Sequence, residues 1–391
     1  MRMFSNVARI SRSFCLAVIL NSSLLIGVAF CQVGLQQAMV AKDQHTPNLF
    51  KMHGVVATGV SADANGVAVV KVFTDRAVAN IPAQLNGVNV VVVNSGEFFS
   101  FDRLTTQEKP DSVNADAQMG NGNGNGGGPG GGGGGPGGGG GGGGSVSPQD
   151  RFDRPVPIGV SLGSTGPNFC FAGTLGCRLK ATSSGGVSHY ILSNNHVIAN
   201  ENQGDVGSDQ MIQPGTLDNN CFLDFGDSIG VLFDFVPIAF NGSANSVDAA
   251  IAVTDTNNTG SATPAGEAYG QPTSNTRAAV VGERVVKYGR TTDYTFGRID
   301  SVNVSVNVGY DAGTAFFTNQ IVIRGTKPNG NGNSTFSAGG DSGSLIVHLN
   351  SNDPVGLLFA GNNSFTIANP IDAVLDAFST SGVTFTVDDG N

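Results

Sequence analysis

A glycine-rich tract divides this chain and limits how it can fold. Between Gly120 and Gly144 stand 20 of the chain's 58 glycines, almost without interruption. Glycine has no side chain to bury and loses the most backbone entropy on ordering, so residues 109–147 are predicted to be a disordered linker. The glycines lack a three-residue period, which excludes collagen. The linker separates a small unit, residues 48–108, from a larger domain, residues 148–391, and the two are predicted to move independently.

The small unit reads as a compact β or α/β structure. Two apolar segments, residues 54–60 and 67–73, are separated by the turn residues 63–66, and a third segment follows at 87–93. About sixty residues are just enough to support a small core of this kind. By analogy with other secreted proteins, a segment ahead of an enzyme domain can assist folding or cover a cleft, but no cleavage point is evident here.

Residues 1–31 have the pattern of a secretory signal. Arginines at positions 2, 9 and 12 precede an apolar run, and Ala29 and Cys31 are small residues suited to cleavage before Gln32. The polar residues 21–23 interrupt the run and argue against a membrane span, although an uncleaved anchor remains an alternative. The chain is therefore predicted to be secreted or periplasmic, with no stable membrane span after cleavage.

Charge and cysteine usage restrict the partners. The net charge is −10 with 13% charged residues, which argues against a nucleic-acid surface. Three cysteines follow the predicted signal, namely Cys170, Cys177 and Cys221. In an oxidising compartment two of them can pair, and the sequence does not say which. Their spacing carries no metal signature, so we expect no metal and no cofactor.

One serine stands among small residues directly before an apolar strand, in the run Ser337-Ala338-Gly339-Gly340-Asp341-Ser342-Gly343-Ser344-Leu345. A serine hydroxyl becomes a good nucleophile only when a base takes its proton and donors stabilise the oxyanion. Glycine permits a tight bend here, so the amides of Gly340 and Ser342 could converge on a carbonyl oxygen as an oxyanion hole. Taken alone, the run also fits an ordinary glycine-rich turn.

Two further polar residues stand at the ends of apolar segments. His196 follows the segment 189–192, and Asp248 begins the segment 248–253. Loops at the ends of a rigid scaffold commonly carry catalytic groups. Taken singly, however, His196 also fits a residue that caps a strand, and Asp248 a turn acid that caps local amides.

The order His196, Asp248, Ser342, with gaps of 52 and 94 residues, is that of chymotrypsin-type enzymes. Together with Gly340-Asp341-Ser342-Gly343, this order resembles the trypsin-like (chymotrypsin-fold) serine peptidases, in particular their bacterial secreted members. The run Asn194-Asn195-His196-Val197 departs from their usual Ala-Ala-His-Cys and is similar to the Asn-Asn-His-Val of HtrA-type bacterial peptidases. The resemblance covers residues 148–391, but its motifs are short.

The resemblance implies an all-β fold of two six-stranded antiparallel barrels, with the three residues in the cleft between them. A C-terminal helix is predicted over residues 370–378, which begin with proline and repeat apolar residues at helical spacing. The implied activity is that of a serine endopeptidase acting on peptides or proteins. His196 would be the general base, Asp248 its orienting acid and Ser342 the nucleophile. The sequence does not indicate an oligomeric state.

Specificity and activation are less fully specified. In trypsin-like enzymes the counterpart of Asp341 pairs with a freshly cut amino terminus, but residues 148–165 contain no Ile-Val-Gly-Gly run. Another partner for Asp341 is therefore expected. Phe336 lies six residues before the nucleophile and, with Gly361, is predicted to form a substrate pocket for a neutral or apolar residue. Two alternatives stay open: an esterase that uses the same triad, and a catalytically inactive binding module with the same fold.

Overall fold

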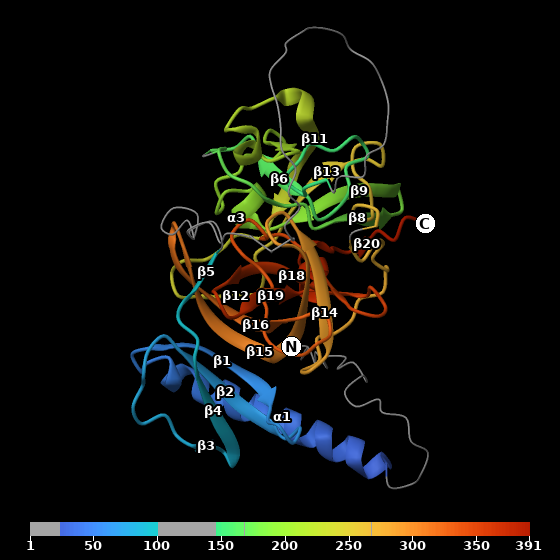
Figure 1. The fold of residues 1–391 in the computed structure, drawn as a ribbon. Coiled ribbons are helices and arrows are strands. Elements are labelled where there is room, and N and C mark those ends of the chain that lie inside the picture. The colour runs from blue at the N-terminus through green and yellow to red at the C-terminus, as the bar shows by residue number, and fades with distance from the viewer. Residues whose placement is uncertain (1–23, 101–145, 168, 267) are drawn as a thin grey trace, which may run out of the picture.

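The computed structural model describes residues 24–100, 146–167, 169–266 and 268–391 (Figure 1). In residues 24–33 only the backbone is described. Residues 1–23 of the predicted signal, and the predicted linker except for its last two residues, lie outside the described part of the chain.

Six strands of the C-terminal half form a closed antiparallel barrel. Their order is β14-β15-β16-β19-β18-β17, and β17 pairs with β14 to complete the ring. In β15, valines alternate with small polar residues from Ser301 to Val308, and this period of two buries one face of the strand. The six strands are β14 Arg284–Gly289, β15 Asp293–Tyr310, β16 Gly313–Thr326, β17 Leu345–His348, β18 Pro354–Gly361 and β19 Thr366–Pro370.

A second sheet, of eight strands within the described residues, curls into the other barrel in the order β20-β8-β9-β13-β11-β10-β6-β7. Its longest hairpin, β8–β9, turns at Gly186, whose φ of +119° suits glycine. The strands are β6 Ser161–Ser164, β7 Gly173–Thr174, β8 Cys177–Ser183, β9 Gly186–Ser193, β10 Gln210–Ile212, β11 Ser228–Phe235, β13 Ala250–Thr254 and β20 Val383–Val387. The connections contain α3 Asn195–Ile198, η1 Thr216–Asn219, η2 Phe225–Asp227 and β12 Ala244–Asn245, which pairs with β16.

The predicted fold class is confirmed: the chain is mainly β, with two antiparallel barrels and a C-terminal helix. That helix is α4, Ile371–Phe378, with Pro370 at its N-cap. The closed barrel has the predicted six strands, whereas the other sheet is larger because β7 and β20 add to it. Both additions are short or terminal, and they form through pairing with β6 and β8 rather than through a strong local pattern.

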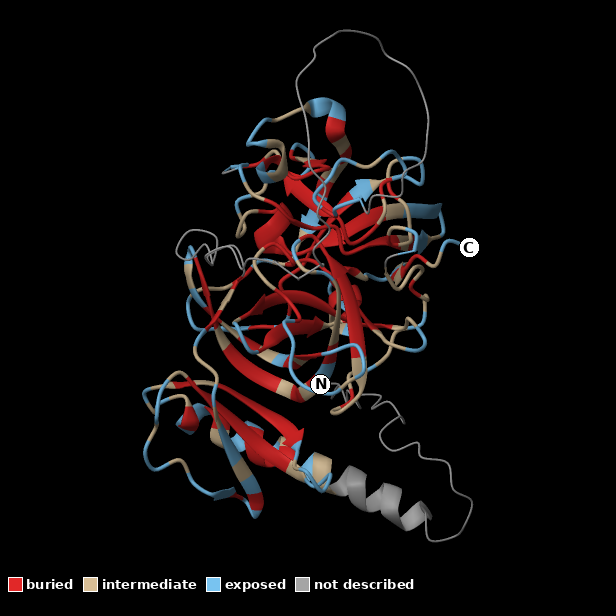
Figure 2. Cartoon of the chain, viewed as in Figure 1, coloured by how far each residue is buried: buried red, intermediate tan, exposed pale blue. Residues whose placement is uncertain are grey.

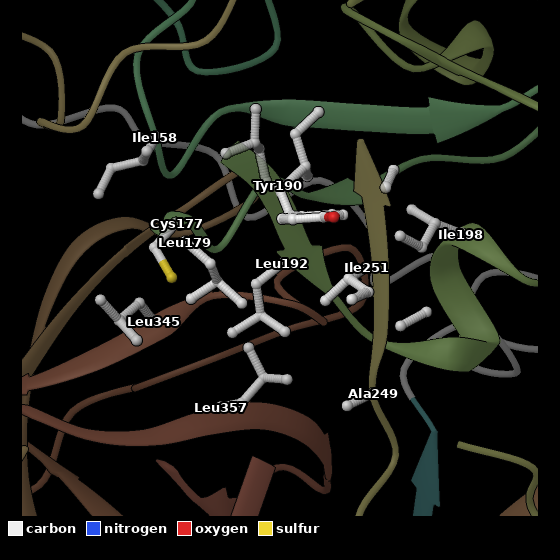
Figure 3. Close-up of a cluster of buried hydrophobic side chains, with 14 of the residues drawn as sticks. Ile158, Cys177, Leu179, Tyr190, Leu192, Ile198, Ala249, Ile251, Leu345 and Leu357 are labelled. Carbon is white, nitrogen blue, oxygen red and sulfur yellow. The ribbon is translucent and has the colours of Figure 1, made fainter. Parts of the chain in front are cut away.

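One buried cluster joins the two barrels (Figure 3). Cys177 and Leu192 come from the first barrel, and Leu345 and Leu357 from the second, and each of the four is fully buried. Burial of apolar area is the main favourable term in folding, so this shared cluster fixes the barrels against one another. Figure 2 shows that the strands on both sides of this junction are largely buried.

The N-terminal unit is α/β and continues the sheet of the second barrel. Helix α1 (Leu24–Leu49) packs on strands β1 and β2 through a buried cluster that includes Ala38 and Ala41. Strand β1 pairs with β15, and the Lys42 ammonium donates a hydrogen bond of 2.9 Å to Ser305. The expectation that the two units move independently therefore disagrees with the structure. The strands are β1 Val55–Ala62, β2 Ala68–Thr74, β3 Gln84–Leu85, β4 Val88–Asn94 and β5 Phe98–Ser100.

Helix α1 spans the predicted signal boundary at residue 31. Its described side chains begin at Leu35, and Leu35, Ala38 and Ala41 pack on the small sheet. Among the helices of the described residues, none combines the length and hydropathy required to span a membrane.

Candidate active site

His196 and Asp248 are in direct contact. His196 lies in the single turn of α3 that follows β9, and Asp248 lies two residues before β13, the neighbour of β9 in the sheet. The imidazole Nδ1 is 2.5 Å from one carboxylate oxygen of Asp248, and the His196 backbone amide donates to the other oxygen at 3.2 Å. Both side chains are fully buried. The carboxylate therefore fixes both the ring and the backbone of the histidine.

Three residues that the sequence did not indicate hold Asp248 in place. The Tyr310 hydroxyl donates to the carboxylate at 2.9 Å, and the Tyr310 ring packs edge-on against the imidazole. The Asn194 side chain donates to the Asp248 carbonyl at 2.8 Å, and Asn369 pairs with both the amide and the carbonyl of Asp248. The signal available for Tyr310 was its position at the end of an alternating strand, before the turn Asp311-Ala312-Gly313.

Ser342 lies in the bend between Gly340 and Gly343. The φ angles of the two glycines are +92° and +94°, in the region that other residues avoid. A Cβ atom on Gly343 would collide with the Ser193 side chain and the Thr174 carbonyl. The Thr174 amide in turn donates to the Ser342 carbonyl at 2.8 Å. The bend is thus held against the end of β9, three residues before His196.

The backbone amides of the bend are arranged unevenly. Those of Asp341 and Ser344 donate within the bend at 3.0 Å, and that of Gly343 donates to the Leu358 carbonyl at 2.9 Å. Among the described residues, the amides of Gly340 and Ser342 have no hydrogen-bond acceptor. The Ser342 hydroxyl is directed toward the Phe359 carbonyl at 3.4 Å. Buried amides are normally paired, so two unpaired amides on either side of Asp341 could take an anionic oxygen.

Asp341 has a buried cationic partner, Lys287. The ammonium lies 3.5 Å from the carboxylate, and both side chains are fully buried. The carboxylate also accepts hydrogen bonds from the amides of Thr291, Thr292 and Ala338, and from the Thr292 hydroxyl at 2.7 Å. Burial lowers the pKa of Lys287, and the charge of Asp341 acts in the opposite direction. Lys287 is the partner that the sequence left open, and its signal was a lysine inside an apolar strand.

The two residues predicted for the substrate pocket lie in the second barrel. Phe336 belongs to a buried cluster with Ile299 and Ile323, and its carbonyl accepts hydrogen bonds from the hydroxyls of Thr292 and Thr295. Gly361 is the last residue of β18, where it is paired with Phe99 of β5. The hydrogen bonds of Phe336 and the strand pairing of Gly361 are to the second barrel and to β5, and a substrate pocket formed by the two residues stays a prediction.

The cysteine pairing is resolved by the structure. Cys170 and Cys221 form a disulfide across a separation of 51 residues. Cys177 is a free thiol in the cluster that joins the barrels, and burial raises its pKa. Within the described ranges, no group of three or more His, Cys, Asp or Glu side chains is placed to hold a metal ion.

Comparison with known families gives a partial match. A family model described as the Nal1 C-terminal domain matches residues 238–370, about a third of the chain, which includes Asp248 and Ser342 but not His196. No curated protein matches the sequence.

Solved structures of bacterial serine proteases are similar to this chain. Thermobifida fusca protease A has 16% identity and a TM-score of 0.39, covering 60% of this chain and 99% of that one. Cellulomonas bogoriensis chymotrypsin has 20% identity and a TM-score of 0.37, covering 61% of this chain and 100% of that one. A glutamic acid-specific serine protease has 22% identity and a TM-score of 0.38, covering 60% and 100%. At this low similarity, the roles of single residues rest on the geometry of this chain.

Proposed function

We propose that this chain is a serine endopeptidase with His196, Asp248 and Ser342 as its catalytic triad. The observation that carries the proposal is the buried 2.5 Å contact between the imidazole Nδ1 and the Asp248 carboxylate. A carboxylate at Nδ1 places the imidazole proton on that nitrogen, which makes Nε2 the basic one. It also stabilises the imidazolium that forms when His196 takes the proton of Ser342.

In the proposed reaction the Ser342 Oγ attacks the carbonyl carbon of a peptide bond while its proton passes to His196. The carbonyl oxygen becomes an oxyanion and accepts hydrogen bonds from the Gly340 and Ser342 amides. When the intermediate collapses, the C–N bond breaks and His196 returns the proton to the leaving amine. Water then attacks the carbonyl carbon of the acyl-enzyme and gives a proton to His196. The ester bond to Ser342 breaks, and His196 returns the proton to the Ser342 Oγ.

The domain organisation and the location belong to the same proposal. Residues 1–31 would be a cleaved signal, residues 109–147 a linker and residues 148–391 the catalytic domain of a secreted or periplasmic protein. The disulfide between Cys170 and Cys221 supports an oxidising compartment. Amino-terminal sequencing of the exported protein tests this part, because a mature chain that starts with Met1 contradicts it.

A fluorophosphonate probe tests the catalytic assignment, because it reacts with an activated serine. Labelling at Ser342 is expected for the native chain and is lost in Ser342→Ala and His196→Ala. The matched control is His189→Ala, which removes a histidine from β9, the strand that precedes His196 in the chain. If Ser342 is not labelled in the native chain, and also not in the variants described below that displace strand β5, the result contradicts a catalytic role and supports the binding module. Hydrolysis of esters but not of peptides would reassign the activity to an esterase.

A further inference from the structure

The end of β18 presents a strand edge that leads to Ser342. Up to Leu357, β18 lies between β17 and β19. Leu358 still pairs with the bend, through the Gly343 amide and the Ser344 carbonyl, and beyond it only β19 continues alongside β18 among the described residues of the two barrels. The Phe359 carbonyl, one residue before this edge, accepts from the Ser342 hydroxyl at 3.4 Å. An extended chain that pairs with Ala360 and Gly361 therefore passes directly beside the hydroxyl.

Strand β5 of the N-terminal unit occupies this edge. It runs antiparallel to β18, with Phe99 opposite Gly361 and Ser100 opposite Ala360. Because the pairing is antiparallel, each step forward along β5 is a step backward along β18, toward the residue that contacts Ser342. Figure 1 shows β5 leaving the N-terminal unit and running up beside the second barrel.

The other side of β5 is paired as well. Phe98 and Phe99 lie opposite Val308 and Gly309 of β15, in parallel register. The next residue of β15 is Tyr310, whose hydroxyl donates to Asp248. Strand β5 is thus inserted between β18, whose Phe359 contacts Ser342, and β15, whose Tyr310 contacts Asp248.

Side-chain contacts anchor β5 to the barrel. The Asn362 side-chain amide donates to the carbonyls of Ser95 and Glu97, both at 3.1 Å. Phe98 is 1% exposed and belongs to a buried cluster with Phe317 and Phe359 of the second barrel. At the same time Ser342 is 0% exposed and His196 is 2% exposed. Both residues are therefore closed to solvent while β5 is paired with β18.

We infer that β5 is an intramolecular pseudo-substrate, which occupies the strand edge where a substrate peptide pairs. This inference rests on the proposed function. Recognition at this edge uses backbone hydrogen bonds, so the substrate class is an extended peptide segment without proline at the positions opposite Ala360 and Gly361. The chain cleaves other polypeptides only when β5 has left the edge.

Displacement of β5 tests the inference through Phe99→Pro, because proline removes a ladder donor and fits poorly between two strands. The matched control is Ala64→Pro, which places proline in an exposed turn of the same unit. The rate of fluorophosphonate labelling of Ser342 is expected to rise on the order of tenfold in Phe99→Pro and to stay unchanged in Ala64→Pro. Asn362→Ala, which removes the anchor but leaves β5 intact, is expected to give a smaller rise and serves if Phe99→Pro does not fold.

A binding measurement keeps the inference separate from catalysis. In a Ser342→Ala background, a fluorescein-labelled peptide with the sequence of residues 94–100 is expected to bind the Phe99→Pro chain but not the Ala64→Pro chain. The same peptide with proline at the position of Phe99 is expected not to bind. Peptide binding without Ser342 labelling in any variant shows that β5 covers a peptide-binding edge, but it overturns the proposed function and with it the role of β5 as a pseudo-substrate. Equal labelling of all variants, with no peptide binding, overturns the inference and leaves the function standing.

Discussion

Replacement of Lys287 by methionine removes the cation beside Asp341 and keeps a side chain of similar length. At the 3.5 Å separation of this pair, two unit charges attract by about 5 kcal/mol at an effective dielectric constant of about 20. Both side chains are fully buried, so solvent screens this attraction little. Removal of one partner leaves the other charge buried, which costs about 3–5 kcal/mol. We therefore expect Lys287→Met to lower the free energy of unfolding by that amount.

Urea unfolding followed by circular dichroism measures this change, and Arg277→Met is the matched control. Arg277 also pairs with a carboxylate, Glu283 at 2.6 Å, but the two side chains are 28% and 21% exposed. A pair in contact with solvent contributes about 1 kcal/mol or less, so the control should have a small effect. The double variant Lys287→Met with Asp341→Asn should lose less than the sum of the single variants, because no unpaired charge remains buried.

The pH dependence of the free energy of unfolding is a second, independent test of the role of Lys287. Burial lowers the pKa of Lys287 below its usual value near 10.5, so the unfolded chain holds this proton more tightly than the folded chain. Between the lowered pKa and about 10.5, this group therefore makes the folded state more stable as the pH rises. Lys287→Met should lack that rise. If Lys287→Met is no more destabilising than Arg277→Met, the bend around Ser342 does not depend on a buried ion pair.

Three further predictions concern the site and its support. Tyr310→Phe keeps the ring but removes a hydrogen bond to the Asp248 carboxylate worth about 1.5–3 kcal/mol, so the rate of fluorophosphonate labelling should fall roughly tenfold or more without loss of fold; an unchanged rate contradicts this role. Replacement of Cys170 and Cys221 by serine frees a 51-residue loop in the unfolded state, and urea unfolding should show a loss of about 4 kcal/mol. Burial tends to raise the pKa of Asp388, but the Gly390 amide and Arg178 outweigh it and hold the pKa below its usual value. Its contribution is present above about pH 4 and lost as the pH falls through the lowered pKa, so Asp388→Asn should be less stable at neutral pH and lose less on acidification.

The bend around Ser342 could be predicted because its cause is local. The backbone at 340 and 343 has positive φ angles, which favour glycine, and the glycines at these two positions are visible in the sequence. The supports of Asp248 are not local. Tyr310 lies 62 residues away along the chain and Asn369 lies 121 residues away. A tyrosine at a strand end and an asparagine in a strand carry no local sign of a shared partner.

The same reasoning separates the strands that could be predicted from those that could not. The alternating valines of β15 specify a strand regardless of what it pairs with. Strands β7 and β12 have two residues each and exist only because β6 and β16 lie beside them. Strand β5 has three residues and depends on two partners more than 200 positions later. No pattern within three residues specifies such a partnership.

Strand β15 connects the N-terminal unit to the site by two routes, and this determines how the unit should be studied. The first route is strand β1, which pairs with β15 around Val304. The second is strand β5, which pairs with β15 at Val308 and Gly309. Removal of residues 24–100 would open the edge of β18, but it would also deprive β15 of its β1 partner a few residues before Tyr310. The activity of the isolated domain, residues 148–391, would then combine two opposing effects: a gain from the open edge of β18 and a loss from the missing β1 partner of β15. The single change Phe99→Pro keeps the β1–β15 pairing and therefore isolates the effect of the occupied edge.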